Sequence, residues 1–312
     1  MRPTEPSSHD LFLGVDGGGT KTQIVIIDPI EKVVAEGMSG PSNPLRVGVD
    51  VAVSNIFEAI NEACDAADRS SEDIRNSFVG LAGVRRADIR ETVKRRLESR
   101  LPTCSFTVVT DAEIALFGST LGEPGAVLIA GTGSICFGKN SEGNTAMAGG
   151  WGPLAGDEGG GASIAKQALQ AIAKALDGRG RPTKLCDVAV DYFRAATAED
   201  LIVAIYAPKM DNRRLAGFAK CVVETALEGD EIAMEILAVA GFELGMAAYA
   251  VLKKLELDKE EVPIGAVGSI FKAGRLIFEP LLETVHSFAP EAYLKEPELN
   301  PAHAAAVMAR QS

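Results

Sequence analysis

The sequence predicts an α/β protein of two similar domains, each opening with a three-stranded antiparallel meander. The length of 312 residues corresponds to roughly two domains. Each half opens with three short apolar segments, and in each half a turn rich in Gly and Thr joins the first two segments. These turns are DGGGT at 16–20 and AGTGS at 130–134. We therefore expect an internal duplication, with a cleft between the two domains.

The first half has the pattern of three strands, a helix, a strand, a helix and a strand. The glycine turn and the Asp28-Pro29 turn separate its first three apolar runs, which is typical of a meander. Apolar residues at helical spacing then predict the helices. The predicted strands are 11–15, 23–27, 32–36, 78–81 and 106–110, and the predicted helices are 51–64 and 87–101.

The second half repeats the opening of the first and then becomes mainly helical. Its predicted strands are 126–130, 135–138, 145–148 and 264–268, and its predicted helices are 162–176, 214–227, 230–257, 274–288 and 301–310. The segment 121–125, Leu-Gly-Glu-Pro-Gly, has the composition of a loop and is the natural boundary between the halves.

Charge and cysteine content exclude several classes of function. Lys and Arg number 31 against 43 Asp and Glu, so the net charge is −12 and no nucleic acid or anionic membrane partner is expected. The five cysteines include no CxxC pair, which is typical of reduced thiols and disfavours a zinc or iron–sulfur site held by one chain. Residues 1–10 lack the pattern of a signal peptide and no run of about 18 apolar residues is evident. We expect a soluble cytoplasmic protein.

The first glycine turn fits neither of the common phosphate-binding motifs. A P-loop places Lys directly after its last glycine, but Thr20 intervenes here, and a dinucleotide fingerprint requires glycine where Thr22 stands. Both motifs also require a helix where the sequence predicts a strand. A β-hairpin remains, whose backbone N–H groups and Thr20 hydroxyl could meet phosphate oxygens and whose Asp16 could hold Mg²⁺. One such turn could be purely structural, but two matched turns favour polyphosphate binding.

Three further residues attract attention, each with a structural alternative. Asp111 follows a buried strand where the chain passes toward the second domain, so it is either a carboxylate at the cleft floor or the cap of a helix starting at Ala112. Asn43 precedes a proline and by itself reads as an Asx turn. Trp151, the only tryptophan, lies among glycines, and core and ligand-binding roles are equally compatible with that position.

Six motifs in order resemble the BadF/BadG/BcrA/BcrD ATPase-type branch of the actin-like ATPase and sugar kinase superfamily, within it most closely the N-acetylglucosamine and bacterial glucosamine kinases. They are LFLGVDGGGTKT, SGPSNP, VVTDAE, LIAGTGS, GGWGPLAGDEGGG and AVGSIFKAG. The resemblance implies two duplicated RNase H-like (actin-like ATPase) domains, one of 11–121 completed by a C-terminal helix at 300–312, the other of 122–299.

The resemblance also implies ATP and Mg²⁺ as cofactors and an amino sugar, N-acetylglucosamine or glucosamine, as the acceptor. Asp111 would be the general base that accepts the proton of the attacking hydroxyl, and Asp16 would hold the metal. The implied nucleotide-binding residues are Gly17, Gly18, Gly19, Thr20, Lys21, Gly131, Thr132, Gly133, Gly268, Ser269 and Phe271. The implied sugar-binding residues are Asn43, Asp111, Trp151, Gly152 and Asp157.

Two other functions occur among similar proteins. ATPase activators of 2-hydroxyacyl-CoA dehydratases or benzoyl-CoA reductases need cysteines in a glycine-rich turn of the second domain to share a cluster, and neither Cys136 nor Cys186 lies in one. DNA-binding sugar sensors carry a helix-turn-helix before the first hairpin, where about ten residues stand here. A homodimer is common among relatives, yet the apolar helix at 232–255 could equally be a core element.

Overall fold

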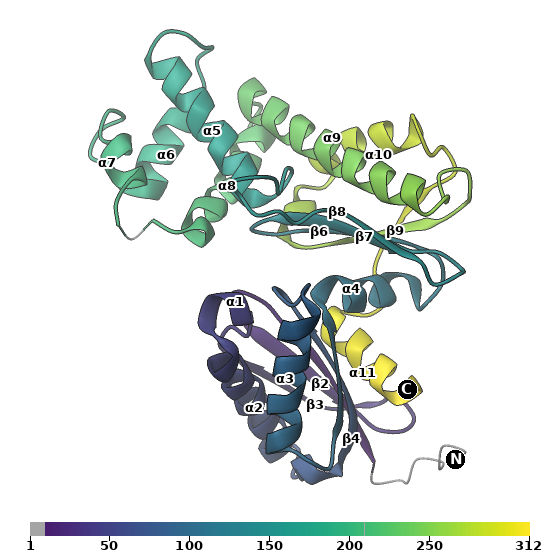
Figure 1. Ribbon diagram of the computed structural model, residues 1–312. Coiled ribbons are helices and arrows are strands. Elements are labelled where there is room, and N and C mark those ends of the chain that lie inside the picture. The colour runs from purple at the N-terminus through teal and green to yellow at the C-terminus, as the bar shows by residue number, and fades with distance from the viewer. Residues whose placement is uncertain (1–9, 209) are drawn as a thin grey trace. The chain divides into compact units, whose positions relative to one another are not determined.

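The computed structural model describes residues 10–208 and 210–312. The chain forms two compact units (Figure 1). Unit 1 comprises the described residues up to Gly122 together with Pro297–Ser312, and unit 2 is Glu123–Glu296. Unit 2 is therefore an insertion between two parts of unit 1.

Unit 1 contains a five-stranded sheet of order β3-β2-β1-β4-β5. Its strands are β1 (Leu11–Gly17), β2 (Thr22–Ile27), β3 (Val33–Ser39), β4 (Ile74–Leu81) and β5 (Ser105–Thr110). The first three strands are antiparallel, and β4 and β5 run parallel to β1. The predicted meander and both later strands are thus confirmed.

Helices cover both faces of this sheet (Figure 1). They are α1 (Pro44–Val47), α2 (Val49–Ala66), α3 (Ala87–Arg100), α4 (Asp111–Thr120) and α11 (Pro301–Gln311). Alternate residues of β1 face opposite sides, so Leu13 and Val15 join the core under α2 and α3 whereas Phe12 packs against α11. This alternation places the side chain of Asp16 on the face that carries α4 and α11.

Unit 2 repeats the strand order of unit 1, β8-β7-β6-β9 followed by β10. Its strands are β6 (Gly125–Ala130), β7 (Ser134–Lys139), β8 (Thr145–Gly149), β9 (Pro263–Val267) and β10 (Tyr293–Lys295). Again three antiparallel strands are followed by parallel ones. The repeated order confirms the predicted duplication of an actin-like α/β fold. The short strand β10 was not predicted.

The helices of unit 2 pack around one large apolar core. They are α5 (Gly161–Leu176), α6 (Leu185–Phe193), α7 (Leu201–Ile205), α8 (Asn212–Leu227), α9 (Glu231–Lys254) and α10 (Arg275–His286). The sequence predicted four of these and missed α6 and α7.

Helix α9 corrects one expectation drawn from the sequence. Its 24 residues include an 18-residue window that is apolar enough to cross a membrane by length and composition, so such a run is present after all. Half of that window is buried inside the protein, with Leu237, Leu244 and Val251 fully buried in the unit 2 core. Burial of this kind is what the core helix of a globular unit shows.

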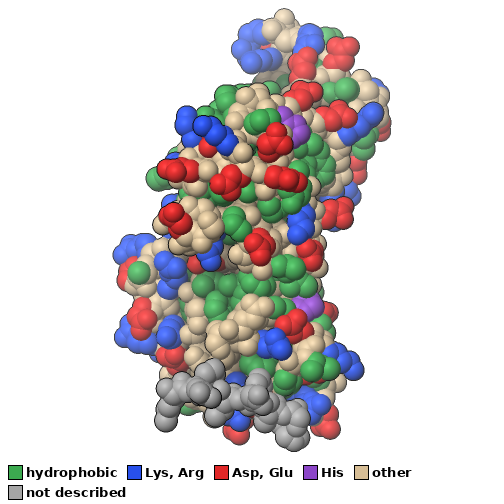
Figure 2. Space-filling model, turned by 90° about the vertical axis from the view of Figure 1, so that its right-hand side faces the viewer, with side chains coloured by type: hydrophobic (Ala, Val, Ile, Leu, Met, Phe, Trp, Pro, Cys, Tyr) green, Lys and Arg blue, Asp and Glu red, His purple; other side chains and the backbone are tan. Residues whose placement is uncertain are grey.

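On the face drawn in Figure 2, Asp and Glu side chains alternate with Lys and Arg side chains among the described residues. Acidic residues exceed basic ones by twelve in the whole chain.

Candidate functional site

The first glycine turn is a tight hairpin with unused donors. Gly18 N–H donates to Lys21 O at 2.9 Å and closes the turn between β1 and β2. Among the described residues, the amides of Gly19 and Thr20 have no acceptor, and the Thr20 and Lys21 side chains are exposed. Free adjacent N–H groups in a glycine turn are the arrangement that receives phosphate oxygens.

The turn between β6 and β7 in unit 2 has the same character. Gly131 N–H donates to Gly133 O at 2.9 Å, and within the described chain the amides of Thr132 and Gly133 have no acceptor. Helix α5 begins directly against this turn, because Gly161 N–H donates to Gly131 O at 2.8 Å and Ala162 N–H donates to Thr132 O at 3.0 Å. The turn is therefore held rigidly by the start of a 16-residue helix.

Two carboxylates of unit 1 interact at one end of its sheet. Asp16 lies near the end of β1, opposite Gly80 of β4, and Asp111 is the first residue of α4. Gly80 leaves room for α4, since a Cβ there would meet Ile114 of that helix at 2.3 Å. Burial and the negative charge of Asp111 raise the pKa of Asp16 to about 6, while Lys21 opposes the rise. Burial also raises the pKa of Asp111, although the Ala112 amide opposes this.

The alternative in which Asp111 caps a helix starting at Ala112 is corrected by the structure. The helix starts at Asp111, and its cap is Thr110, whose hydroxyl accepts from Glu113 N–H at 3.3 Å. The Glu113 carboxylate accepts in return from the Thr110 amide and hydroxyl, both at 2.7 Å. This capping box satisfies the helix end without Asp111, whose Oδ1 accepts from Ala112 N–H at 3.0 Å.

Asn43 lies on a loop that is bound to the first hairpin. Gly18 O accepts from the amides of Ser42 at 3.1 Å and Asn43 at 3.2 Å. The Asn43 side chain caps α1 by accepting from Leu45 N–H at 3.0 Å, so the Asx-type cap considered from the sequence is present. This bond uses Oδ1 only, and the Nδ2 group remains available as a donor.

Asp157 ties the loop after β8 to the second hairpin. It is buried, with a positive φ of 62°, and its Oδ1 accepts from Gly152 N–H at 3.0 Å. Burial raises the pKa of Asp157, while the amides of Gly152 and Ser134 oppose the rise. Trp151 of the same loop is 72% exposed, which decides against a core role for it.

Gly268 and Phe271 follow β9 and differ in their surroundings. Gly268 has a φ of 122° and lies so close to β6 that a Cβ would meet Ala130 O at 2.2 Å. Ser269 is exposed and begins a short 3₁₀ turn. The Phe271 ring packs in the core and stacks on Phe278 at a centroid distance of 5.5 Å. A nucleotide contact of Phe271 stays a prediction.

Comparison with known proteins shows the family. The model of the BadF/BadG/BcrA/BcrD ATPase family matches residues 13–309. The chain belongs to this family.

Among relatives in the BadF/BadG/BcrA/BcrD ATPase family, two cover nearly all of the chain. An N-acetylmuramic acid/N-acetylglucosamine kinase of Clostridium acetobutylicum is 30% identical over 298 residues, covering 96% of this chain and 97% of the relative. An N-acetyl-D-glucosamine kinase of Dictyostelium discoideum is 33% identical over 316 residues, covering 98% and 99%.

Solved structures give the same fold. A Chromobacterium violaceum protein, provisionally named an N-acetylglucosamine kinase, superposes with a TM-score of 0.77 at 25% identity and covers 97% of this chain and 99% of its own. A ROK family glucokinase of Streptomyces griseus, at 16% identity and a TM-score of 0.62, covers 97% and 100%.

The carboxylates of this family member suit a metal that arrives with a nucleotide. No cluster of three His, Cys, Asp or Glu side chains able to hold a metal occurs among the described residues. Mg²⁺ is commonly bound by one or two carboxylates, with phosphate oxygens and water completing its shell. Asp16, partly buried and one residue before the hairpin glycines, fits such a ligand.

Two features of this site were not singled out from the sequence. The capping box had a sequence signal, because TDAE at 110–113 has the S/T-x-x-E pattern. Arg46, whose side chain covers Gly19, had none, since a single charged residue after a proline is typical of any surface loop.

Proposed function

We propose that this protein transfers the terminal phosphoryl group of ATP to a hydroxyl of an amino sugar, N-acetylglucosamine or glucosamine. The observation that carries the proposal is Asp111, a partly buried carboxylate at the first position of α4 that accepts from the Ala112 amide and has a second carboxylate nearby. The whole-length relatives bear the names of amino sugar kinases, which favours this reaction class over activator ATPases.

Asp111 is proposed as the general base. Within the described part of the chain no side-chain or backbone donor is hydrogen-bonded to its Oδ2 by distance and angle, so this oxygen is open to the hydroxyl of an acceptor. A carboxylate accepts the proton of the attacking hydroxyl best when it is ionised and fixed in place. The capping box of Thr110 and Glu113 fixes the first turn of α4, which carries Asp111.

The hairpin of unit 1 is proposed to bind ATP through the Gly19 and Thr20 amides and the Thr20 hydroxyl, with Gly17 and Lys21 beside them. In unit 2 the amides of Thr132 and Gly133, with Gly131, Gly268 and Ser269, are the proposed nucleotide contacts. Asp16 is proposed to hold Mg²⁺, which neutralises phosphate charge during transfer.

Sugar recognition is proposed for the Nδ2 group of Asn43 and, in unit 2, for Trp151, Gly152 and Asp157. One oxygen of Asp157 is already bonded to Gly152, so its contact with a sugar hydroxyl would use the other. We further propose a cytoplasmic location, where ATP is available, and a homodimer that light scattering would detect.

The activator function is less consistent with the cysteines. Cys136 lies on β7 and is completely buried, and Cys186 on α6 is partly buried against the unit 2 core. A cluster shared between subunits needs thiolates at the surface.

A coupled ADP-release assay with ATP and Mg²⁺ tests the proposal, using glucosamine, N-acetylglucosamine, N-acetylmannosamine, N-acetylmuramic acid and glucose with a no-sugar control. Mass spectrometry of the sugar products is run in parallel. A rate well above the control together with a phosphorylated amino sugar is expected. Sugar-independent ATP turnover without a phosphosugar would refute the kinase function and favour the activator function.

A further inference from the structure

Arg46 lies over the first glycine hairpin. The three heavy atoms nearest to a Cβ built on Gly19 all belong to the Arg46 side chain, with Nη1 at 3.0 Å and Cδ and Cζ at 3.3 Å. The Arg46 side chain is exposed to solvent. A guanidinium group is thus placed beside the free amides of Gly19 and Thr20.

The position of Arg46 is fixed by the backbone that carries it. The amides of Ser42 and Asn43 donate to Gly18 O, which binds the loop to the hairpin. Arg46 N–H then donates to Asn43 O at 3.0 Å within α1. Backbone hydrogen bonds of Ser42 and Asn43 therefore link the hairpin to the start of α1, which carries Arg46.

Several arginines of unit 1 have a carboxylate partner that Arg46 lacks. Ion pairs with Asp or Glu are made by Arg75, Arg86, Arg95, Arg96 and Arg310. Within the described part of the chain, Arg46 makes no ion pair and its guanidinium donates no hydrogen bond. An arginine that has no carboxylate partner and lies over a turn with free amides is well placed to bind an anion.

We propose that Arg46 binds a phosphate oxygen of ATP at this hairpin. The guanidinium supplies directed positive charge beside Gly19 in the turn that follows Asp16, whose carboxylate interacts with that of Asp111. Positive charge at this turn would offset the repulsion between phosphates and these carboxylates. Arginine suits this task because its fork of N–H groups matches phosphate oxygens. The inference rests on the proposed function only in taking ATP as the anion.

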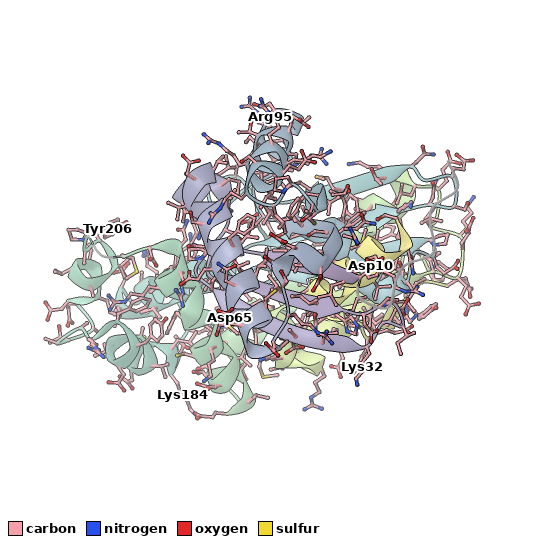
Figure 3. All side chains as sticks on the ribbon, turned by 90° about the horizontal axis from the view of Figure 1, so that it is seen from below. Asp10, Lys32, Asp65, Arg95, Lys184 and Tyr206 are labelled. Carbon is pink, nitrogen blue, oxygen red and sulfur yellow. The ribbon has the colours of Figure 1, made fainter. Side chains whose placement is uncertain are left out.

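Calorimetric titration of the full chain with ATP and Mg²⁺, without sugar, tests the proposal. Arg46→Ala is compared with Arg46→Lys and with Arg95→Ala, a control that removes the same charge from α3, where Arg95 points outward from the ribbon (Figure 3). We expect Arg46→Ala to weaken ATP binding about 10- to 100-fold, Arg46→Lys to weaken it less, and Arg95→Ala to leave it unchanged.

Adenosine serves as the second ligand, because it carries no phosphate. Its affinity should be the same in all variants, and equal melting temperatures would exclude a folding defect in Arg46→Ala. ATP affinity of Arg46→Ala equal to that of Arg95→Ala would overturn the proposal. Since the titration needs no acceptor, a wild-type protein that binds ATP but phosphorylates no sugar would refute the kinase function and leave this inference standing.

The competing anion is the carboxylate of an amino sugar acid. Wild-type and Arg46→Ala proteins are therefore also assayed with N-acetylmuramic acid, which carries a carboxylate, and with N-acetylglucosamine, which does not. Equal losses with both acceptors support phosphate binding. A loss confined to N-acetylmuramic acid, with ATP binding intact, would overturn the phosphate assignment.

Discussion

The Asp157 carboxylate lies directly against Gly133, so close that a Cβ on Gly133 would meet Oδ2 at 2.1 Å. The same carboxylate accepts from Gly152 N–H through its other oxygen. The glycine turn after β6 and the loop after β8 therefore share one buried side chain, and a change in either is transmitted to the other within unit 2.

We expect Gly133→Ala to destabilise the protein by about 1–3 kcal/mol, because Asp157 must move to admit the methyl group. Gly131→Ala is the matched control for stability, since a Cβ there meets nothing within 4 Å. Thermal melts of both variants measure the difference. Equal melting temperatures would contradict the close packing of Asp157 on Gly133.

Asp111→Asn should keep the fold and ATP binding but lower kcat about 100- to 10,000-fold, because the amide cannot accept the proton of the acceptor hydroxyl. Steady-state kinetics with the preferred sugar, together with ATP titration, measure both effects. A variant with wild-type kcat would remove Asp111 from the role of general base.

Thr110→Ala should cost about 1 kcal/mol of stability through loss of the helix cap. It should also reduce kcat more than it raises KM for ATP, because Asp111 is the next residue and depends on the cap for its orientation. Thr110→Ser keeps the hydroxyl and is expected to restore both properties. Failure of Ser to rescue activity would separate the cap from catalysis.

The pH dependence of stability should change in Asp16→Asn. The pKa of Asp16 is raised from 3.8 to about 6, so its contribution to folding is fully present below about 3.8 and is lost as the pH rises through about 6. At neutral pH the ionised carboxylate destabilises the fold by at most about 3 kcal/mol. The variant should therefore gain more stability at pH 8 than at pH 5 in urea unfolding. A gain independent of pH would show that ionisation is not the cause.

Cys136 should resist alkylation in the native protein, because it is fully buried and burial raises the pKa of its thiol. Cys186 and Cys221 are only partly buried and should be modified first. Peptide mapping after a short iodoacetamide treatment measures the order. Modification of Cys136 as rapid as that of Cys186 would show that the strand opens and would revive the activator function.

The sequence was sufficient for the duplicated meander, because strand period and turn composition are local properties. It was insufficient for β10, whose three residues pair with β9 through contacts that no local pattern encodes. Helices α6 and α7 are similarly short, at nine and five residues.

Some residues of the candidate site could likewise be located from the sequence, and others could not. Asp16, Asp111 and both glycine turns follow strands and could be located from the sequence. The exposure of Trp151, the packing of Phe271 and the position of Arg46 over Gly19 depend on residues distant in the chain, and only the folded structure shows them.

The contact between β1 and α11 has a consequence for biosynthesis. A Cβ on Gly14 would meet Ala302 O at 2.0 Å, so the helix lies against the bare backbone of the first strand. The ribosome must synthesise all of unit 2 before α11 emerges to cover that strand. Until then the apolar side chains of Phe12, Val25 and Ile27 lack the helix that covers them in the folded protein, and exposed apolar surface of this kind is prone to aggregation.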